Sequence, residues 1–528
     1  MLPDFITIYR SRLVSPTKIQ KVPMKVCKVV SGRSRSTMPF LVGLLYLSLV
    51  SQSGFSQKVR LVVSSNAGDR LTVKPNLKFQ ESLVSSGDKF EIRDDVRYQT
   101  VDGFGASFLE AGIMCIHDLP ARKQKALFES LFDAKKGSGF SAMKTVIAST
   151  DFMSAGPFYS YDPTPGDVEM KDFSIARDLG PNGLIPYIKR AKSYGKFVLQ
   201  APMDYPPDWM LMDVNKNQDV NPKYYDALAR YYFRYLQEYQ KNGVFIDYLS
   251  LFNEPSIYTK IPWNEINMLL RDHVAPLLHK EGIQTQIMAS EPPTRENAAK
   301  NYPLVLDDPI TIKDVALLPY HGYDFKNSDQ IAALHEKYPQ FHLWMTELCH
   351  ANAGTDHPND PLPMGDFLDG NFWGGQIFDD LEASASAWIY WNMVLDENGG
   401  PWSVSVVHSN PDPNSQQPVV IVDRKAKKVI YTGVYYYLSH FSKYVRPGAV
   451  RIETAGKASG VRVMSFVTPD QGIVTEIMNS NKNDTDISLL FHHKTLRVHL
   501  PASSITTAMW KEQAKAADGT AGLHENHP

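Results

Sequence analysis

Two glutamates in the chain lie in contexts suited to joint acid–base and nucleophilic chemistry. Glu254 lies within Leu-Phe-Asn-Glu-Pro (251–255), and Glu347 lies within Trp-Met-Thr-Glu-Leu (344–348). Cleavage of a glycosidic bond needs a carboxylic acid that protonates the departing oxygen and a carboxylate near the anomeric carbon. When that carboxylate is a nucleophile, the two groups lie about 5–5.5 Å apart. We therefore predict Glu254 as the acid/base and Glu347 as the nucleophile of a retaining glycosidase.

Asn253, directly before the predicted acid, adds to this hypothesis. A side-chain amide at this place can bond the sugar 2-hydroxyl, a contact that strengthens as the oxocarbenium-like transition state develops. Glu254 must hold a proton near neutral pH, so we expect burial and the negative charge of Glu347 to raise its pKa. Once Glu347 is consumed in the covalent intermediate, Glu254 can release its proton and activate water.

Short apolar runs that alternate with amphipathic helical stretches, between about residues 100 and 410, predict the elements that bring the glutamates together. Eight runs favour an α/β fold of the closed (β/α)8 TIM-barrel type, and no Gly-x-Gly-x-x-Gly follows the first of them. The 93 residues between the glutamates (347 − 254) fit about three strand–helix units. The predicted strands lie near Gly103–Ser107, Ala142–Ser149, Lys196–Pro202, Tyr248–Phe252, Gln286–Ser290, Val315–Pro319, His342–Thr346 and Ala387–Trp391.

Polar residues stand where each predicted strand ends, and in such a barrel these ends converge on one face. Each residue taken alone is more readily a helix N-cap or a solvated loop residue, but together they describe a pocket rich in carboxylates, amide and aromatic groups. Along the chain they are Ser107 or Glu110, Asp151, Asp204, Asn253 with Glu254, Glu291, His321 with Tyr323, Glu347, and Trp391 with Asn392. Between two of the strands, tyrosines at three- and four-residue spacing in 224–239 predict a helix whose aromatic stripe packs on the barrel.

The rest of the chain predicts a second unit and a leader. Strand-like runs before the barrel and after His440, separated by turn signals, favour a β-sandwich side domain built from both chain ends. The positive residues Arg33 and Arg35, an apolar run over 40–50 and small residues up to Ser56 predict a signal peptide and a secreted or periplasmic protein. We divide the chain into a leader (1–56), N-terminal strands of the β-domain (57–98), the catalytic barrel (99–435), and the β-sandwich with its C-terminal tail (436–528).

Composition and motif spacing argue against three features: a nucleic-acid partner, a membrane segment and a metal site. A net charge of −2 without long runs of one sign argues against a nucleic-acid partner. The apolar run of the leader is short for a bilayer span, so we predict no integral membrane segment in the mature protein. No Cys-x-x-Cys or His-Glu-x-x-His spacing is present, and we predict no metal. The pairing of Cys115 and Cys349, and the oligomeric state, stay open.

With these residues in place, the chain resembles glycoside hydrolase family 30, whose members include glucosylceramidases, β-1,6-glucanases, β-1,6-galactanases and some xylanases. The resemblance extends from about Tyr98 to Trp510. Matching stretches are Val101–Ala106, Ala148–Phe152, Tyr159–Asp162, Phe252–Pro255, Thr346–Cys349, Tyr390–Asn392, Leu395–Pro401, His440–Tyr444 and Arg446–Gly448.

The resemblance implies a barrel with a β-sandwich side domain, retention of configuration, no cofactor, and a carbohydrate or glycolipid substrate. It also implies the two glutamates in the roles given above. Residues implied to line the sugar pocket are Asp151, Asn253, Tyr323 and Trp391, to which we add the strand-end residue His321.

Two positions depart from the glucosylceramidase branch of that family. Lys144 stands where that branch has arginine, which keeps the charge but loses the planar fork. Asp204 stands near the place of a tryptophan. We include both among the substrate-binding residues. A glucosylceramidase-like β-glucosidase is the favoured hypothesis, and an endo-acting β-1,6-glucanase, β-1,6-galactanase or xylanase is the alternative. A barrel that binds carbohydrate without cleaving it is a remote second alternative.

Overall fold

The computed structural model describes residues 58–81, 88–213, 217–257, 259–349, 365–401 and 416–511. All of these residues belong to the second of the two units into which the chain divides, Phe55–Pro528. The leader predicted for residues 1–56 lies outside the described residues. Within the second unit, the described strands form a closed barrel, a ten-stranded sheet and two small sheets.

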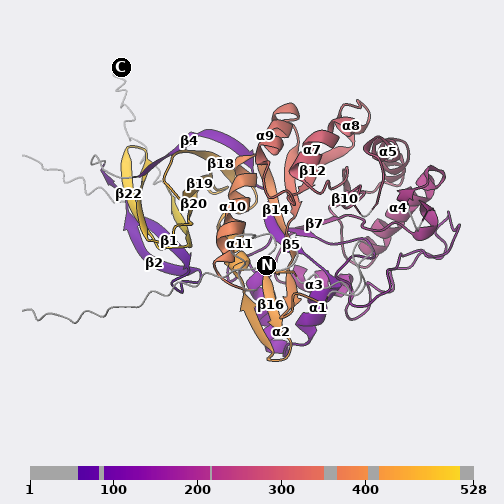
Figure 1. Ribbon diagram of the computed structural model, residues 1–528, viewed down its shortest axis with the longest axis horizontal. Helices are drawn as coiled ribbons and strands as arrows, with labels where there is room; N and C mark the ends of the chain where they lie inside the picture. Colours follow the sequence, from indigo (N-terminus) through magenta and orange to yellow (C-terminus); the bar gives the residue numbers. More distant parts are fainter. Residues whose placement is uncertain are drawn as a thin grey trace, which may run out of the picture. The chain divides into compact units, whose positions relative to one another are not determined.

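The barrel consists of eight parallel strands that close in the order β10-β11-β12-β13-β14-β5-β6-β7 (Figure 1). Every predicted strand overlaps one of them, so the predicted fold class is confirmed. The second predicted strand was too long, because β6 ends at Lys144 and only an isolated parallel bridge between Ile147 and Met203 follows it. The strands are β5 (Gly103–Ser107), β6 (Ala142–Lys144), β7 (Val198–Ala201), β10 (Tyr248–Ser250), β11 (Gln286–Met288), β12 (Val315–His321), β13 (His342–Glu347) and β14 (Ala385–Asn392).

Helices follow the strands around the barrel, and α4 shows why they pack there. The tyrosine stripe of α4 is buried: Tyr231, Tyr232, Tyr235 and Tyr239 are all 0% exposed, as core packing predicts. The described helices are α1 (Glu110–His117), α2 (Ala121–Phe132), α3 (Leu184–Lys192), α4 (Tyr225–Lys241), α5 (Trp263–Leu269), α6 (Ala275–Lys280), α7 (Arg295–Asn301), α8 (Pro303–Leu306), α9 (Ser328–Lys337), α10 (Asp369–Glu382) and α11 (Gly433–Tyr444).

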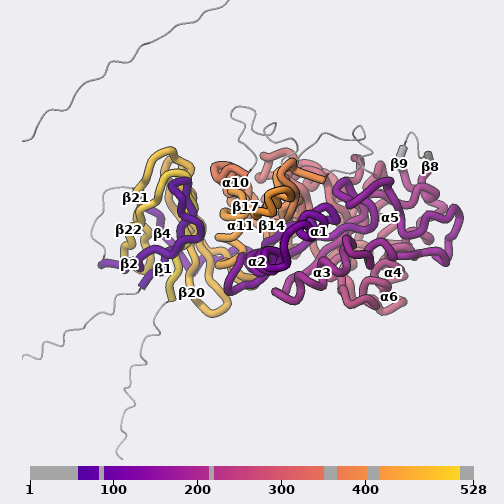
Figure 2. The backbone as a smooth tube through the Cα atoms, turned by 90° about the horizontal axis from the view of Figure 1, so that it is seen from below, coloured from indigo at the N-terminus to yellow at the C-terminus, as the bar shows by residue number. Residues whose placement is uncertain are grey.

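The ten-stranded sheet of the β-sandwich combines both ends of the described chain, so indigo and yellow strands lie side by side in Figures 1 and 2. Its order is β2-β1-β23-β20-β19-β18-β4-β21-β22-β3. The sequence pattern did not predict the last of these strands, β23, which lies between β1 and β20. The strands are β1 (Lys58–Ser65), β2 (Thr72–Lys78), β3 (Gln80–Glu81), β4 (Lys89–Thr100), β18 (Val450–Gly456), β19 (Val461–Val467), β20 (Gly472–Asn479), β21 (Thr485–Phe491), β22 (Lys494–Leu500) and β23 (Ser504–Lys511).

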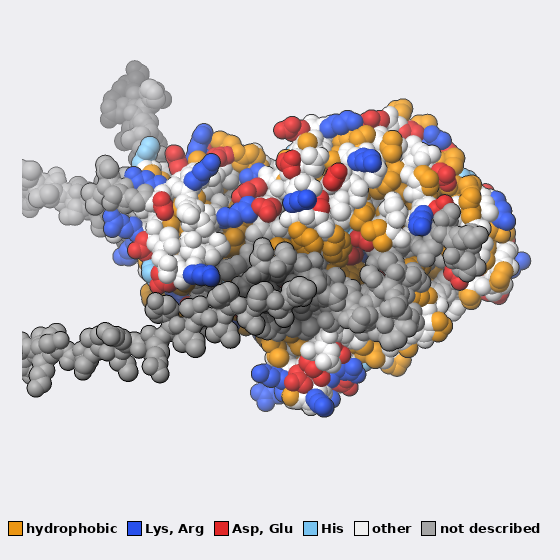
Figure 3. Space-filling view, in the orientation of Figure 1, with side chains coloured by type: hydrophobic (Ala, Val, Ile, Leu, Met, Phe, Trp, Pro, Cys, Tyr) orange, Lys and Arg blue, Asp and Glu red, His pale blue; other side chains and the backbone are white. Residues whose placement is uncertain are grey.

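The small sheets and the surface add little to the site. Both described cysteines, Cys115 and Cys349, are buried and are not bonded to each other. No described helix combines the length and hydropathy that a membrane span requires. On the described part of the face in Figure 3, basic and acidic side chains are interspersed. The small sheets contain β8 (Leu211–Asp213) with β9 (Asn217–Val220), and β15 (Val394–Asp396) with β16 (Val420–Asp423) and β17 (Lys428–Tyr431).

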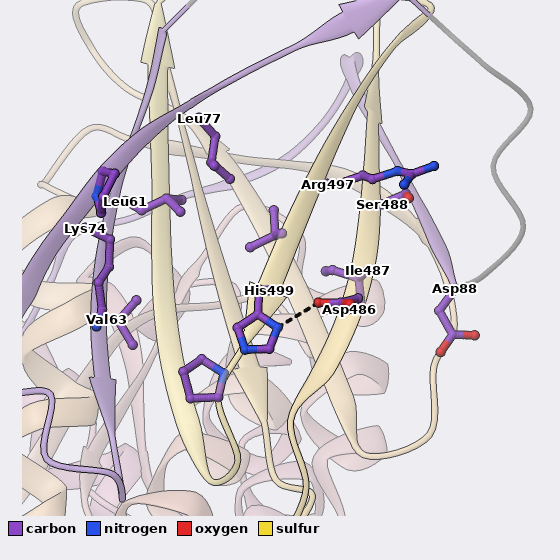
Figure 4. Close-up of a pocket in the computed structure, with 13 residues that line it drawn as sticks. Leu61, Val63, Lys74, Leu77, Asp88, Asp486, Ile487, Ser488, Arg497 and His499 are labelled. Carbon is purple, nitrogen blue, oxygen red and sulfur yellow. Dashed lines mark hydrogen bonds and ion pairs between the residues drawn. The ribbon is translucent and has the colours of Figure 1, made fainter. Parts of the chain in front are cut away.

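A cavity of about 670 Å³ opens within the β-sandwich (Figure 4). Its apolar side chains include Leu61 and Val498, and His499 and Asp486 form an ion pair at its edge, with 2.8 Å between Nδ1 and Oδ1. None of the site residues predicted from sequence lines this cavity. Because its lining comes from the sandwich strands and the residues beside them, we treat it as separate from the barrel chemistry.

A buried polar chain joins α11 to the sandwich. His440 is 0% exposed; its Nδ1 lies 2.6 Å from the Thr507 hydroxyl, and its Nε2 lies 3.0 Å from the Ser64 hydroxyl. Thr507 donates to Glu476 Oε2 at 2.7 Å, whereas Glu476 Oε1 has no hydrogen-bond partner among the described residues. Burial raises the pKa of Glu476 to about 8, although the Thr507 hydroxyl opposes this shift, and burial lowers the pKa of His440 to about 3.

The raised pKa of Glu476 makes the stability of the protein pH-dependent. Between the usual pKa of 4.5 and the folded value of about 8, the folded state holds one proton more than the unfolded state. The free energy of unfolding is therefore expected to fall with rising pH in this window, by about 1.4 kcal/mol per pH unit from this group. Denaturant titrations from pH 6.5 to pH 8 check this, because below pH 6.5 the lowered pKa of His440 changes the free energy of unfolding in the opposite direction. Glu476→Gln should flatten the slope, and the exposed Glu91→Gln should not; equal slopes in all three proteins would contradict the prediction.

Candidate active site

Strand ends bring the predicted residues together at one end of the barrel. Lys144, His321 and Glu347 are the last residues of β6, β12 and β13. Asn253 and Glu291 follow β10 and β11 and pair as an isolated parallel bridge. These five side chains are at most 5% exposed. The convergence follows from parallel strand direction, which puts every carboxyl end on the same face.

The two glutamates, distant in sequence, lie close together. Glu254 and Glu347 each have a carboxylate oxygen within 4.8 Å of the other. They are 4% and 5% exposed, so each is largely removed from water. The backbone of Glu254 has φ of 45°, in the left-handed region that is costly for a residue with a side chain. Such strain persists where surrounding contacts fix the conformation, and here the Glu254 amide donates to Glu291 O at 2.9 Å.

Lys144 is the central donor of a buried hydrogen-bond network that includes Asn253, Glu291 and Glu347. Its ammonium group has three protons, and it donates to Glu291 Oε2 at 2.5 Å, Glu347 Oε2 at 2.8 Å and Asn253 Oδ1 at 2.9 Å. The side chain is 0% exposed, and the two carboxylates raise its pKa although burial opposes that shift. All three donors therefore point to protein oxygens. The lysine holds the side chains of Asn253, which precedes the predicted acid, and of Glu347, the predicted nucleophile.

His321 connects the predicted acid, Glu254, to the same buried hydrogen-bond network. Its Nδ1 lies 2.8 Å from Glu254 Oε1, and its Nε2 lies 2.9 Å from Glu291 Oε2. Burial lowers the pKa of His321, but Glu347 and hydrogen bonds to the other two carboxyl groups outweigh burial and raise it to about 9. At neutral pH the ring is therefore an imidazolium that donates to Glu254 on one side and to Glu291 on the other.

The carboxyl groups respond to this network in opposite directions. Burial raises the pKa of Glu254; His321 and Lys144 oppose this shift, and the negative charge of Glu347 adds to it. Burial also opposes ionisation of Glu291, but Lys144 and His321 together lower its pKa. The network therefore shifts Glu254 toward its protonated form and Glu291 toward its ionised form.

Glu254, His321 and Glu347 also have the spacing of a metal site, because one ligand atom of each lies within 4.8 Å of the others. A histidine ligand must be neutral with a free ring nitrogen. Here both nitrogens of His321 face carboxyl groups, and its raised pKa keeps the ring charged. The Lys144 ammonium already lies 2.8 Å from Glu347. These donors do not fit a metal ion in this protonation state.

The remaining predicted residues lie around the glutamates. Tyr323 donates its hydroxyl to Glu347 Oε1 at 2.8 Å, and this hydroxyl is 3.5 Å from Cys349 Sγ. The Lys144 ammonium lies 5.1 Å from the centroid of the Trp391 ring. These contacts place Tyr323 and Trp391 beside the nucleophile candidate: Tyr323 follows β12 and Trp391 lies on β14, the two strands on either side of β13.

Asp151 and Asp204 form a second carboxyl pair. They are 7% and 2% exposed, and Tyr205 donates to Asp151 Oδ1 at 2.9 Å. Burial raises the pKa of Asp204 strongly; Lys144 opposes this shift and Asp151 adds to it. Asp204 Oδ1 has no hydrogen-bond partner among the described residues.

Two residues with central contacts, Glu291 and Tyr205, were not among the site residues predicted from the sequence. Glu291 was placed at a strand end but not among the site residues, although it bonds both Lys144 and His321. Tyr205 carried no signal beyond its place after a strand. Glu110, considered at the end of the first strand, instead accepts from Ser154 and Arg177.

Removing the charge of Glu291 is expected to shift the pH dependence of the reaction. Glu291→Gln leaves a surplus positive charge beside Glu254, which favours the ionised form of Glu254 and so lowers its pKa. The alkaline limb of the kcat/KM–pH profile should therefore move down by about one pH unit. Glu296→Gln, an exposed neighbour on α7, serves as the control and should keep the wild-type profile. An unchanged or upward-shifted limb in Glu291→Gln would contradict this account.

Comparison with known proteins is consistent with this geometry. Residues 101–445 match the glycosyl hydrolase family 30 TIM-barrel domain, and residues 448–508 match the family 30 beta sandwich domain. A Caenorhabditis elegans protein with the provisional name glucosylceramidase 4 is 27% identical over 81% of this chain and 83% of its own length. An endo-1,6-beta-D-glucanase of Neurospora crassa is 27% identical over 71% and 78%, respectively.

Among solved structures, SrfJ from Salmonella typhimurium superposes with a TM-score of 0.77 at 21% identity, covering 86% of this chain and 100% of that chain. At this identity the superposition establishes the fold alone. The family model, which matches well over half of the chain, establishes more. The chain therefore belongs to glycosyl hydrolase family 30 and is a glycoside hydrolase.

Proposed function

We propose that the protein is a retaining β-glucosyl hydrolase in which Glu347 is the nucleophile and Glu254 the acid/base. The observation that carries this proposal is the approach of the two carboxylates to within 4.8 Å. Retaining glycosidases hold this pair about 5–5.5 Å apart, whereas inverting enzymes separate it by about 6.5–9.5 Å to admit a water molecule. The short separation favours direct attack by a carboxylate.

The proposed roles follow from the contacts. Glu347 receives hydrogen bonds from Lys144 and Tyr323, which hold its carboxylate in place for attack on the anomeric carbon. The raised pKa of Glu254 keeps a proton available for the leaving oxygen. After Glu347 is bound covalently its negative charge is lost, the pKa of Glu254 falls, and Glu254 can take a proton from water.

The surrounding residues divide into two groups in this proposal. Lys144 and His321 are completely buried and engaged by protein groups, so we assign them to positioning and charge balance. Asn253, Asp151, Asp204 and Trp391 supply hydroxyl contacts and a ring face to the sugar. The glucosyl preference is supported by the names of the two relatives, glucosylceramidase and endo-1,6-beta-D-glucanase.

Proton NMR of the first product tests the proposal. The purified protein is incubated with an aryl β-glucoside, glucosylceramide and β-1,6-glucan, and with galactan and xylan as comparison substrates. We expect cleavage of at least one β-glucosyl substrate with initial release of the β-anomer. Initial α-anomer would overturn retention, and cleavage of galactan or xylan alone would overturn the glucosyl assignment.

Export of the protein is a separate proposal, based on the predicted signal peptide. The mature chain should begin near Gln57, and the intact mass of secreted material checks this. Residues before about Gly54 still attached to secreted protein would contradict it.

A further inference from the structure

One buried arginine, Arg295, is not used by the chemistry described so far. It is the first residue of α7, and it is 1% exposed. Its Nε and Nη2 donate to Asp380 Oδ1 and Oδ2 at 2.8 and 2.9 Å, which is the bidentate geometry that a guanidinium forms with a carboxylate. Asp380 lies on α10 and is 0% exposed. A buried ion pair needs further hydrogen bonds to offset its desolvation, and these bonds lead towards the site.

Asp380 connects the ion pair to the strands on both sides of β13. Its Oδ1 accepts from the hydroxyl of Tyr320 on β12 at 3.0 Å, and its Oδ2 accepts from Nε1 of Trp388 on β14 at 3.0 Å. Both strands pair with β13, which ends at Glu347. The guanidinium of Arg295 is therefore held at a defined place relative to the strand of the proposed nucleophile.

The other donors of Arg295 hold the turn that follows β12. Its Nη1 donates to Gly322 O and to Asp324 Oδ1, each at 3.0 Å, and lies 3.4 Å from Lys326 O. Tyr323 stands between the first two of these acceptors. Because both of its neighbours bond the same buried guanidinium, the backbone of Tyr323 has little freedom to move.

Close packing and backbone strain add to the hold on this turn. A Cβ atom on Gly322 would lie 3.0 Å from Arg295 Nη2 and 3.1 Å from Nη1, so the guanidinium lies directly against the turn. Phe325 and Asn327 have φ of 52° and 64°, in the left-handed region that is costly for residues with a side chain. Such strain persists only where surrounding contacts fix the conformation, and the bonds of Arg295 are contacts of this kind.

We propose that Arg295 is a positioning residue of the reaction, which holds the hydroxyl of Tyr323 against Glu347. Tyr323 donates to Glu347 Oε1 and Lys144 donates to Glu347 Oε2, so each oxygen of the carboxylate has its own donor. If the turn moves, Oε1 loses its donor and the carboxylate can rotate about the remaining bond. Attack on the anomeric carbon needs a defined geometry, and misplacement by about 1 Å can cost about 10²-fold in rate. This inference rests on the proposed function, in which Glu347 is the nucleophile.

Replacement of Arg295 by lysine tests the role. Lysine keeps the charge, but one ammonium group lacks the planar fork that reaches Asp380 and the Gly322 carbonyl at once. In Arg295→Lys we expect kcat on an aryl β-glucoside to fall about 10- to 100-fold while KM changes less than about threefold. Inactivation by 2-deoxy-2-fluoroglucosyl fluoride, which reports attack by the nucleophile, should slow by a similar factor. Wild-type values of kcat and of the inactivation rate would overturn the proposal.

A double-mutant cycle with Tyr323→Phe separates positioning from a general loss of stability. Tyr323→Phe removes the hydroxyl through which Arg295 is proposed to act. Adding Arg295→Lys to Tyr323→Phe should therefore lower kcat by less than about threefold further. The unfolding midpoint, in contrast, should fall by the same amount when Arg295→Lys is added to the wild type or to Tyr323→Phe. Effects on kcat that multiply would overturn the proposal.

Two further variants guard against failure to fold and against an unspecific effect of the change. Gly322→Ala keeps every charge and places a methyl group against the guanidinium, so it should also lower kcat, and this loss should also disappear in the Tyr323→Phe background. Arg271→Lys is the matched control. Arg271 bonds two carboxylates, Asp272 and Asp308, and among the described residues none of its hydrogen bonds goes to the turn after β12. It should keep wild-type kcat; an equal loss in Arg271→Lys would contradict the specific role of Arg295.

A crystal structure of Arg295→Lys distinguishes failure of this role from failure of the proposed function. Wild-type protein that hydrolyses none of the glucosyl substrates would overturn the function, but the structure of the variant needs no activity. A Tyr323 hydroxyl displaced beyond hydrogen-bond distance from Glu347 Oε1 would support positioning by Arg295. An unchanged contact between Tyr323 and Glu347 would overturn it.

Discussion

Replacement of Glu347 by glutamine is expected to abolish turnover while the protein remains folded. Glutamine has the same shape but cannot form the covalent glycosyl intermediate, and loss of a catalytic nucleophile lowers kcat by about 10⁴-fold or more. Lys144 and Tyr323 donate to different oxygens of Glu347; in glutamine the amide oxygen can still accept from Lys144, and the amide nitrogen can donate to the Tyr323 hydroxyl, so the barrel should keep most of its stability. Rates on an aryl β-glucoside, together with the unfolding midpoint, check both parts.

Glu336→Gln is the matched control, since Glu336 is exposed on α9. A 2-deoxy-2-fluoroglucosyl fluoride should also label the wild type on the peptide that contains Glu347, as peptide mass would show, and should not label Glu347→Gln. Near-normal turnover in Glu347→Gln, or a label on another carboxylate, would overturn the assignment of the nucleophile.

Replacement of Glu254 by alanine is expected to produce a different defect, one that a small anion repairs. Loss of a general acid and base costs about 10²–10⁴-fold in rate. For an aryl glycoside with a good leaving group, formation of the intermediate needs no proton, so breakdown of the intermediate becomes limiting. Azide enters the space left by the carboxyl group and attacks the intermediate without a base. The rate should therefore rise with azide concentration, and the product should be a β-glycosyl azide.

The stereochemistry of the azide product makes this experiment decisive. Two successive displacements return the β-configuration, whereas an α-azide would mean that azide attacked the substrate directly and would contradict the assigned roles. Azide should not accelerate Glu347→Gln to the same β-product. Lack of rescue in Glu254→Ala with a good leaving group would remove the evidence for Glu254 as the base.

The barrel was predictable from sequence because its signal is local and repeated. Each buried parallel strand is a short apolar run, and each run ends in a polar residue. Parallel direction then places those ends together without further information. For this reason Glu254 and Glu347 could be paired across 93 residues, and His321 and Tyr323 could be expected near them.

The connections beneath the glutamates were not predictable in this way. Which oxygens a buried lysine meets depends on distances across the barrel, and no spacing in the sequence encodes that Lys144 faces Glu291. β23 was missed because Thr506 and Thr507 interrupt its apolar pattern, although both are buried at 0% exposure.

The pairing of β1 with β23 has a consequence for the time course of biosynthesis. Ser65 pairs with Ser504, so 439 residues (504 − 65) must be synthesised between the two ends of this strand pair. At a synthesis rate of about 5–20 residues per second, β1 lacks its partner β23 for roughly 20–90 s. Throughout that interval the nascent chain carries a strand with unpaired amide and carbonyl groups, the kind of edge that promotes aggregation. A chain that terminates before β23 never completes the pairing, so holding factors that protect β1 should matter more for the yield of this protein than for an enzyme whose sheet is built from one stretch of sequence.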